Sequence, residues 1–369
     1  MEPKKILIIA RAIYPAQFPR AYRATELATE LARQGHEVIL YALLGKYDYS
    51  LFEKDHNLKV KNIGNMWFAT LNSDGTGRRN FIDKVLSKIF NRLIDFPDIE
   101  LMFRIPAILR KEANIDFLIS VAKPFTIHWG CALAKTISPA NFPKVWAADC
   151  GDPYMGNRVT KKSPLFYFKY IEKWFCRKTD HIVIPIKEAI EGYYPEFKSK
   201  ITVIPQGFNF DNLDIDIGPP HNKILTFSYS GIFYKGFRDP SMFLEYLCNI
   251  KKDFKFVIFT HDQSLLEPFK SRLKGKIEIR PYIPRHELLK ILSKMDFLVN
   301  FENGTSVHSP SKLIDYALTK RPILSINNTI LPLEIINDFF ERNYNAKYII
   351  EDIERYNIKF IAHNFLDLI

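Results

Sequence analysis

The sequence predicts an α/β fold made of two consecutive doubly wound units, and three observations lead to this prediction. Short apolar segments alternate with amphipathic segments of helical period along most of the chain. The length of 369 residues is large for one hydrophobic core. A polar stretch at residues 209–222, which contains Gly218-Pro-Pro, interrupts the pattern midway and is interpreted as the linker between two domains.

The first unit opens with a β-α-β segment. A strand over Lys5–Ala10 is followed by a loop, a helix from Arg20 to Arg33 that Gly35 ends, and a strand over Glu37–Leu44. The loop Ala10–Pro19 contains no glycine, so the GxGxxG dinucleotide fingerprint is absent, which counts against a nicotinamide or flavin enzyme. Four later strands are expected at Asp116–Val121, Pro143–Ala148, His181–Pro185 and Ile201–Pro205.

Composition is typical of a soluble globular protein, with 47% hydrophobic and 25% charged residues and no apolar run long enough for a membrane span. The first residues are interpreted as a strand and not as a signal peptide. The four cysteines are scattered, which favours free thiols in a reducing cytoplasm. Of the net charge of +11, residues 1–205 carry +10, from 31 Lys and Arg against 21 Asp and Glu. This asymmetry favours an anionic partner: nucleic acid, acidic lipid headgroups or a phosphorylated substrate.

Residues 64–112 are the least regular part of the chain. Within them Phe81–Leu93 has the pattern of a basic amphipathic helix, with Lys84, Lys88 and Arg92 off its apolar face. Such a helix can lie on an anionic membrane surface or hold a lipid-linked substrate. The alternative is an ordinary basic helix that packs on its own domain.

The second unit is expected to run from a strand at Leu225–Ser230 to the stretch Ser309–Ile326. Ser309 and Pro310 are typical of a helix start, and the following helix carries Lys312 and Asp315 off its apolar face. Its N-terminus, with free N–H groups and a positive dipole, is a candidate phosphate site. The alternative is a surface helix in which Lys312 and Asp315 form an ion pair.

Five motifs in order resemble those of retaining glycosyltransferases of family 4, which have the GT-B fold. The resemblance covers most of the chain and reaches the branch that builds bacterial surface polysaccharides. Its motifs are Arg23-Ala-Thr-Glu-Leu-Ala with the first strand, Trp146-Ala-Ala-Asp-Cys-Gly-Asp-Pro153, Ile201-Thr-Val-Ile-Pro-Gln-Gly-Phe-Asn-Phe-Asp211, Tyr229-Ser-Gly-Ile-Phe-Tyr-Lys-Gly236 and Ser309–Ile326.

The resemblance implies a GT-B arrangement of two Rossmann-like domains that face each other across a cleft. Residues 1–208 would bind the acceptor, residues 223–345 would bind a nucleotide-diphosphate sugar, and a terminal helix within 346–369 would cross back to the first domain. No metal or other cofactor is expected, so fixed cations and amide donors would stabilise the leaving diphosphate.

The resemblance also assigns roles to individual residues. His128 and Asp152, which fall at the carboxyl ends of strands, would lie at the reaction centre, and Arg20 and Arg23 would contact the acceptor. Asp315 would bind the ribose. The donor diphosphate would be held by Gly231, Lys235, Arg238, Ser311 and Lys312.

The chain departs from the family pattern at several positions. The partner carboxylate expected eight residues before Asp315 is replaced by Val307, and Glu302 is near but out of register. The usual glycine after the helix is Lys320 or Arg321. The Asp214-Ile-Asp216 string resembles the metal-binding DxD motif of a different glycosyltransferase fold, but it lies in the linker and not after a buried strand.

The sequence therefore predicts a cytoplasmic, membrane-associated glycosyltransferase. It would transfer a hexosyl or N-acetylhexosaminyl group to a lipid-linked or polysaccharide acceptor with retention. One alternative is a nucleotide-sugar epimerase of the same double fold, which would need several carboxylates and histidines converging for acid–base work. Another is a non-enzymatic nucleic-acid-binding protein, suggested by a pI near 9.2 although base-stacking motifs are absent.

Overall fold

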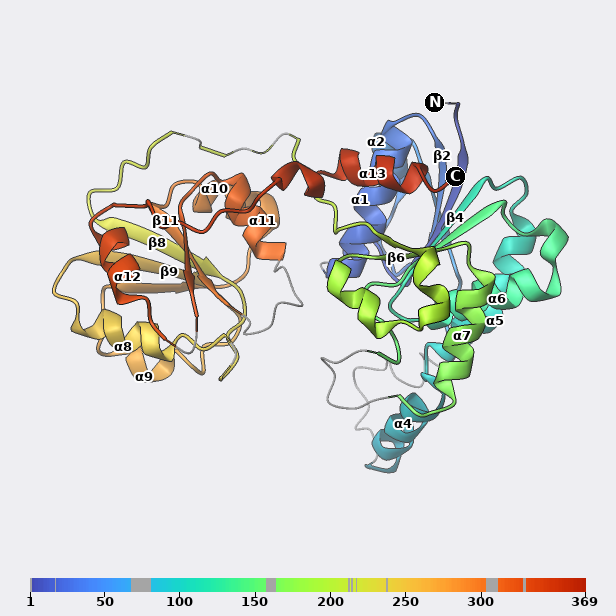
Figure 1. Ribbon diagram of the computed structural model, residues 1–369, viewed down its shortest axis with the longest axis horizontal. Coiled ribbons are helices and arrows are strands. Elements are labelled where there is room, and N and C mark those ends of the chain that lie inside the picture. The colour runs from blue at the N-terminus through green and yellow to red at the C-terminus, as the bar shows by residue number, and fades with distance from the viewer. Residues whose placement is uncertain are drawn as a thin grey trace. The chain divides into compact units, whose positions relative to one another are not determined.

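The computed structural model describes residues 2–16, 18–67, 81–156, 164–211, 213, 215–216, 218–236, 238–302, 311–327 and 330–369. The chain divides into two compact units, residues 1–209 with 355–369 and residues 210–354. Each unit is built on one parallel sheet with helices on both faces (Figure 1), so the predicted α/β class is confirmed. None of the helices in the described residues has both the length and the apolar character that a membrane crossing requires.

The first unit contains a seven-stranded sheet in the order β3-β2-β1-β4-β5-β6-β7. All its described pairings are parallel, so every strand ends at the same edge of the sheet. The strands are β1 (Lys5–Ile9), β2 (Glu37–Ala42), β3 (Lys59–Asn62), β4 (Phe117–Val121), β5 (Val145–Asp149), β6 (His181–Ile184) and β7 (Ile201–Val203).

Alternate residues of β1 enter the two cores of this unit, as the period of a strand requires. Ile6 and Ile8 pack in the core under α1 (Pro19–Arg33) and α2 (Ser50–His56). Leu7 and Ile9 pack in the opposite core. That face is covered by α5 (Ile99–Lys111), α6 (Thr126–Ile137) and α7 (Phe168–Lys178), while α4 (Phe81–Ile94) projects from the unit (Figure 1).

The C-terminal helix α13 (Ile358–Leu366) belongs to the first unit, where it lies beside α1 (Figure 1). Ile361 and Phe365 are fully buried in the core that α1 covers. The backbone also joins Phe208 to Asn357 through an isolated parallel bridge. The chain thus leaves the first unit after residue 209 and returns to it at residue 355.

The stretch interpreted as a linker is attached to the second unit. Arg321 donates hydrogen bonds from Nη2 to the carbonyl oxygens of Asp216, at 2.8 Å, and of Gly218. Asp216 also donates its backbone N–H to Ser293 Oγ at 2.9 Å. The side chains in these bonds come from residues far along the chain, so the composition of the stretch itself could not reveal the contacts.

Three elements between residues 50 and 112 were not predicted: α2, β3 and α5. The short strand β3 pairs with β2 at the sheet edge, and α5 buries Leu101, Ile105 and Leu109 against the core. Pro106 lies inside α5, where a proline normally breaks a helix. Burial of the apolar face of α5 therefore outweighs local helix propensity.

The second unit contains a five-stranded parallel sheet in the order β10-β9-β8-β11-β12. Its strands are β8 (Leu225–Ser230), β9 (Phe254–Phe259), β10 (Ile277–Arg280), β11 (Phe297–Phe301) and β12 (Ile323–Ile326). One face is packed by α8 (Ser241–Asn249), α9 (Glu267–Lys270) and α12 (Leu333–Phe340), and the other by α10 (Arg285–Leu292) and α11 (Ser311–Leu318). The predicted helix start at Ser309 and Pro310 lies outside the described residues.

Candidate functional site

In the second unit, the loop after β8 approaches α11 closely. Gly231 has a φ of +149°, and a Cβ there would lie 2.9 Å from the hydroxyl of Tyr229, so a side chain is excluded. The Ser230 backbone N–H donates to the hydroxyl of Tyr316 at 2.7 Å, which ties α11 to the end of β8. The loop then turns back through a bridge between Tyr234 and Arg238.

Lys312 of α11 has a buried ammonium group. Its Nζ is buried and has no hydrogen-bond partner among the described residues. It lies 4.4 Å from the ring centroid of the fully buried Tyr229. Burial and the nearby charge of Arg238 lower the pKa of Lys312 well below its usual value. A buried ammonium beside a second cation is a site that an anion would stabilise.

The other residues predicted at the diphosphate are placed differently. Lys235 is exposed at the tip of the loop, and Arg238 bonds to the side chain of Tyr229 and lies over the ring of Tyr234. Ser311 begins α11, and its side chain is outside the described set. The arrangement brings Gly231, Arg238 and Lys312 together around Tyr229, and the diphosphate roles of all five residues stay predictions.

Asp315 pairs with Arg285 of α10 and not with Lys312. The Arg285 Nη2 lies 2.7 Å from Asp315 Oδ1, so the alternative of an ion pair within α11 is wrong. Burial raises the pKa of Asp315, and Arg285 opposes this effect. Glu302 lies at the carboxyl end of β11 and accepts a hydrogen bond from Ser325 Oγ at 3.0 Å. Val307 lies outside the described residues.

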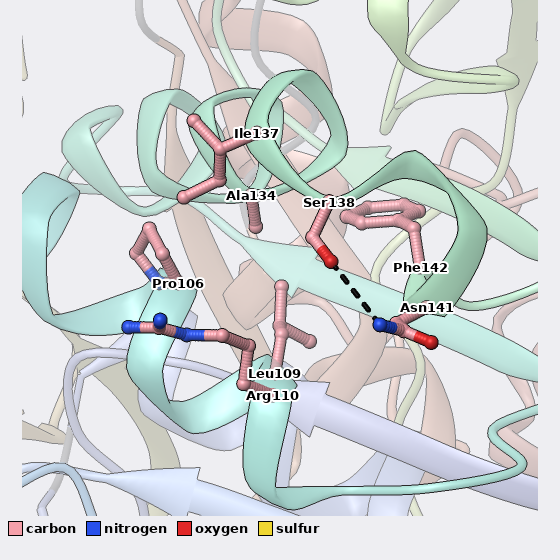
Figure 2. A pocket seen from close by; sticks show the side chains of 8 residues that line it. All are labelled: Pro106, Leu109, Arg110, Ala134, Ile137, Ser138, Asn141 and Phe142. Atoms are coloured by element: carbon pink, nitrogen blue, oxygen red, sulfur yellow. Dashed lines mark hydrogen bonds between the residues drawn. The ribbon is translucent and has the colours of Figure 1, made fainter.

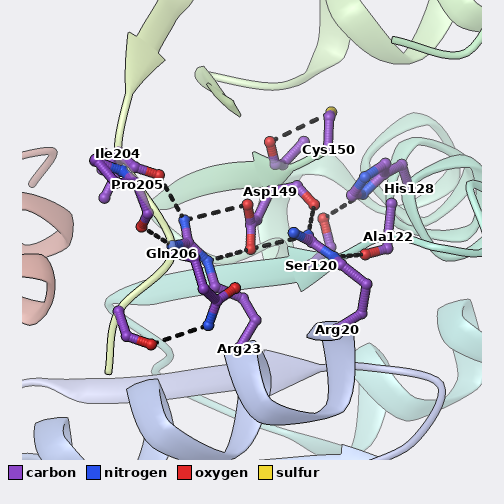
Figure 3. A network of polar contacts seen from close by, with 12 residues as sticks. Arg20, Arg23, Ser120, Ala122, His128, Asp149, Cys150, Ile204, Pro205 and Gln206 are labelled. Atoms are coloured by element: carbon purple, nitrogen blue, oxygen red, sulfur yellow. Dashed lines mark hydrogen bonds and ion pairs between the residues drawn. The ribbon is translucent and has the colours of Figure 1, made fainter. Parts of the chain in front are cut away.

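In the first unit, a buried polar network lies at the carboxyl ends of β4 and β5 (Figure 3). Asp149 is fully buried and pairs with two arginines of α1, Arg20 at 3.0 Å and Arg23 at 2.9 Å. Burial alone would raise the pKa of Asp149, but the two guanidinium groups outweigh burial and hold that pKa below its usual value. The carboxylate is therefore charged and compensated.

Arg23, predicted to contact the acceptor, is buried in this structure, and its acceptor role stays a prediction. Its side chain is 1% exposed, and its nitrogens donate to Asp149, to the carbonyl oxygen of Ile204 at 3.0 Å and to that of Pro205. The guanidinium also lies 5.1 Å from the ring centroid of Phe365. Arg23 joins α1, the end of β5, the chain after β7 and α13.

Arg20 also pairs with Asp149, but unlike Arg23 it is partly exposed to solvent. Its side chain is 21% exposed, and it donates to the carbonyl oxygens of Ala122 and, at 2.6 Å, of Asp149. Its Nη1 faces the turn at Gly151, where a Cβ would lie 3.4 Å away. The acceptor role of Arg20 stays a prediction, with the guanidinium held in place and partly open to solvent.

His128, predicted at the reaction centre, is also buried in this structure, and its catalytic role stays a prediction. The side chain is fully buried in α6 between the rings of Phe125 and Phe175, with centroids 5.4 Å away in both cases. Its Nδ1 lies 2.8 Å from Ser120 Oγ. Burial lowers the pKa of His128 to about 3, so the ring is neutral and packs as a core residue.

Asp152 lies at the surface, as a residue that meets a ligand should. Its carboxylate is 3.7 Å from the ammonium of Lys123, which follows β4, and its side chain is 42% exposed. Burial raises the pKa of Asp95 to about 6. Asp95 lies near Tyr154 and Lys123, and both oppose burial by lowering the pKa of Asp95. The catalytic role of Asp152 stays a prediction.

A small pocket lies in the same unit, where the end of α6 faces α5 (Figure 2). Its cavity volume is about 10 Å³, room for about one water molecule. Pro106, Ile137 and Phe142 line it. It lies at the end of α6 away from Thr126, so it takes no part in the arrangement around Asp152.

Sequence reasoning missed the partners of the predicted residues. Asp149, Lys123 and Arg285 form the ion pairs that fix Arg23, Asp152 and Asp315. These pairs join residues 126, 29 and 30 positions apart. The only sequence signal was the position of Asp149 and Lys123 at the ends of predicted strands, where polar residues gather in open α/β sheets.

A comparison with family models finds that the model described as Glycosyltransferase Family 4 matches residues 21–212, which is more than half of the chain. No curated protein sequence matches the chain.

Among solved structures, the chain is similar to the lipopolysaccharide outer core galactosyltransferase WaaB in its apo form. The TM-score is 0.58 at 12% identity, over 99% of this chain and 98% of that chain. HepE of Anabaena in complex with UDP-glucose gives 0.59 at 8% identity, over 98% of both chains. A putative UDP-N-acetylglucosamine 2-epimerase of Listeria monocytogenes gives 0.53 at 14% identity, over 100% and 96%. At such identities the similarity shows the GT-B fold alone, because transferase and epimerase share it.

Proposed function

Because the chain belongs to glycosyltransferase family 4 and is a nucleotide-sugar-dependent glycosyltransferase, we propose that it transfers a hexosyl-type group, with retention and without a metal, to a surface-glycan acceptor. The acceptor is lipid-linked or polysaccharide. The family match is what favours a transferase over the epimerase that shares the fold. The names of WaaB and HepE, a lipopolysaccharide galactosyltransferase and a protein bound to UDP-glucose, support this class of donor and product.

The observation that carries the proposal is the buried ammonium of Lys312. Lys312 has no hydrogen-bond partner among the described residues, and Arg238 is near enough to lower its pKa further. Two cations around Tyr229 can neutralise the charge that grows on a leaving nucleoside diphosphate, the role a metal plays in other transferases. Asp315 would accept from the ribose once the nucleotide reaches α11, and Arg20 and Asp152 would meet the acceptor.

A thermal-shift screen with UDP, GDP, ADP and CMP and their common sugars, first without metal and then with Mg²⁺, tests the donor assignment. A ligand at about 100 times its Kd should add roughly 2.7 kcal/mol to the unfolding free energy. We expect one nucleoside diphosphate to shift the wild type without metal and to shift Lys312→Met markedly less. Lys274→Met, which removes an exposed lysine of the same unit, is the matched control and should behave as wild type.

Two results would contradict the donor assignment. If no nucleotide shifts the wild type, the second unit does not hold the donor as proposed. If Lys312→Met shifts as much as the wild type, the diphosphate lies elsewhere in the unit. A shift that appears only with Mg²⁺ would contradict the metal-independent mechanism.

The proposal includes peripheral contact with an anionic membrane, where a lipid-linked acceptor would be found. Helix α4 supports it, because Ile89, Phe90, Leu93 and Ile94 share one face and are 39–46% exposed. The alternative, that this face packs on its own domain, would have buried them. Lys88 and Arg92 on the same helix are exposed and would meet acidic headgroups.

Cosedimentation with phosphatidylcholine vesicles, with and without phosphatidylglycerol, tests the membrane contact. We expect binding only to the phosphatidylglycerol vesicles, weaker at high salt, and reduced about tenfold in Phe90→Ser/Leu93→Ser. Phe360→Ser, on the exposed side of α13, is the control. Equal binding by the two variants would show that α4 is not the contact.

A further inference from the structure

We propose that Tyr14 and Tyr47 form a platform in the first unit that binds a neutral pyranose residue of the acceptor glycan, away from the sugar that receives the transferred group. This inference rests on the proposed transfer to a glycan. It adds the chemical class of the acceptor, because a platform of this kind recognises sugar rings and not only a lipid anchor.

The two rings lie against each other and are both open to solvent. Tyr14 is 45% and Tyr47 is 42% exposed, and their centroids lie 5.5 Å apart with the planes at 87°. The neighbouring side chain of Tyr14 raises the pKa of Tyr47. Tyr14 also stacks on Phe52 at 5.5 Å, and Tyr47 meets Tyr49 edge-on at 4.9 Å.

The backbone beneath the platform is fixed as well. The Tyr14 N–H donates to Thr25 Oγ1 of α1 at 2.9 Å, and the hydroxyl of Tyr49 donates to the carbonyl oxygen of Tyr14 at 2.6 Å. Aromatic side chains that are held by hydrogen bonds and still exposed are typical of ligand contacts, since burial in the core would otherwise be more favourable. Phe18 and Tyr22, 41% and 39% exposed, add aromatic surface at the start of α1.

The platform lies at the same sheet edge as the predicted acceptor residues. Tyr14 follows β1 and Tyr47 follows β2, while Arg20 bonds to carbonyl oxygens just after β4 and at the end of β5. These strands are neighbours in the order β2-β1-β4-β5. With neighbouring strands about 4.8 Å apart, the platform is roughly 10–15 Å from Arg20 along the edge. A trisaccharide can bridge that distance.

The chemistry of the platform matches a sugar ring. The axial hydrogens of a pyranose form an apolar face that packs on an aromatic ring, and its equatorial hydroxyl groups can bond to phenolic oxygens at the rim. Arg11, which follows β1, pairs with Asp98 at 2.9 Å and offers a further polar group after this strand. The contact surface between the rings carries no charge, so a neutral sugar fits better than a phosphate.

Saturation-transfer NMR with maltotriose, cellotriose and chitotriose tests the platform. We expect transfer to ring hydrogens of at least one trisaccharide, and about tenfold weaker binding in Tyr14→Ala and Tyr47→Ala. Tyr47→Phe keeps the ring and should retain most of the binding. Tyr170→Ala, a 60% exposed tyrosine of α7, is the matched control and should bind as wild type. A thermal melt of each variant separates loss of the platform from loss of fold.

Other outcomes overturn the inference. The platform is excluded if no trisaccharide shows transfer, or if the tyrosine variants and the Tyr170→Ala control bind alike. Loss of phosphatidylglycerol-vesicle binding in the tyrosine variants, with sugar binding intact, would assign the rings to the membrane contact. The nucleotide thermal shift should be unchanged in these variants, so failure of the donor assignment remains distinguishable from failure of the platform.

Discussion

Arg23 of α1 and Lys312 of α11 each follow a strand end and have a buried charged group, and their surroundings are opposite. Arg23 of α1 is surrounded by acceptors: the carboxylate of Asp149 and the carbonyl oxygens of Ile204 and Pro205. Lys312 of α11 has only the face of Tyr229, with no hydrogen-bond acceptor among the described residues.

We propose that the difference separates a structural charge from a functional one. A buried charge is tolerated when it is paired and hydrogen-bonded, and it is costly when it is alone. The pairing of Arg23 ties four chain segments together, so this charge contributes to folding. The ammonium of Lys312 contributes nothing comparable, and its burial is explained if an anionic ligand completes the site.

The largest expected effect on stability comes from removing the counter-charge of Arg23. Asp149→Asn leaves Arg23 buried without its counter-charge, which should lower the unfolding free energy by about 3–5 kcal/mol. Urea denaturation measures it. A loss below about 1 kcal/mol would contradict the structural role, since that is the range of exposed ion pairs.

Substitution of the unpaired Lys312 should not lower stability. Lys312→Met removes a buried charge and keeps the volume, so the unliganded protein should be as stable as wild type or more stable. The Kd of the preferred nucleoside diphosphate, measured by calorimetry, should rise about 10–100-fold, because charge-assisted hydrogen bonds contribute about 1.5–3 kcal/mol. Marked destabilisation of the unliganded variant would mean that Lys312 is structural after all.

The lowered pKa of Lys312 predicts that the unfolding free energy depends on pH, with a definite sign. In the unfolded chain Lys312 titrates near 10.5, and burial, followed by Arg238, lowers its pKa well below that value in the folded protein. Between the two pKa values the unfolded state binds more protons, so the unfolding free energy should rise with pH through that window. Titrated denaturation of wild type and Lys312→Met checks this, and the slope should be smaller in the variant. An equal slope would assign the titration to another group.

The smallest expected effect is at the exposed pair of Asp152 and Lys123. Asp152→Asn removes an interaction across 3.7 Å at a 42% exposed side chain, so stability should change by less than about 1 kcal/mol. If Asp152 meets the acceptor as predicted, transfer should slow while nucleotide affinity is unchanged. A normal transfer rate in this variant would remove Asp152 from the reaction centre.

Much of the fold could be predicted because the local pattern and the final packing agree. The alternation of Ile6, Leu7, Ile8 and Ile9 matches a strand buried on both faces, and the structure puts alternate residues in two cores. α5 was missed because Pro106 argues against a helix, while burial of Leu101 and Ile105 outweighs that local signal. Propensity acts over a few residues, and burial depends on the whole sheet.

The candidate site was harder to predict than the fold. Lys312, Arg238 and Gly231 were found by their motifs, and the structure brings them together around Tyr229. Arg23 and His128 were assigned to ligands by the family resemblance, and the structure shows both side chains buried. A sequence does not state whether a charged side chain will meet a ligand or a residue 126 positions away.

The sequence by itself determined the α/β class, the presence of two sheets and the motifs of family 4, because strand and helix periods and short loop motifs are local properties of the chain. Only the tertiary structure decided which cations are already compensated. Ion pairs such as Arg23–Asp149 and Arg285–Asp315 depend on which strand ends lie side by side, and their energies depend on burial. Both are properties of the folded chain. Lys312 has no such partner among the described residues, and we propose that the donor diphosphate binds there.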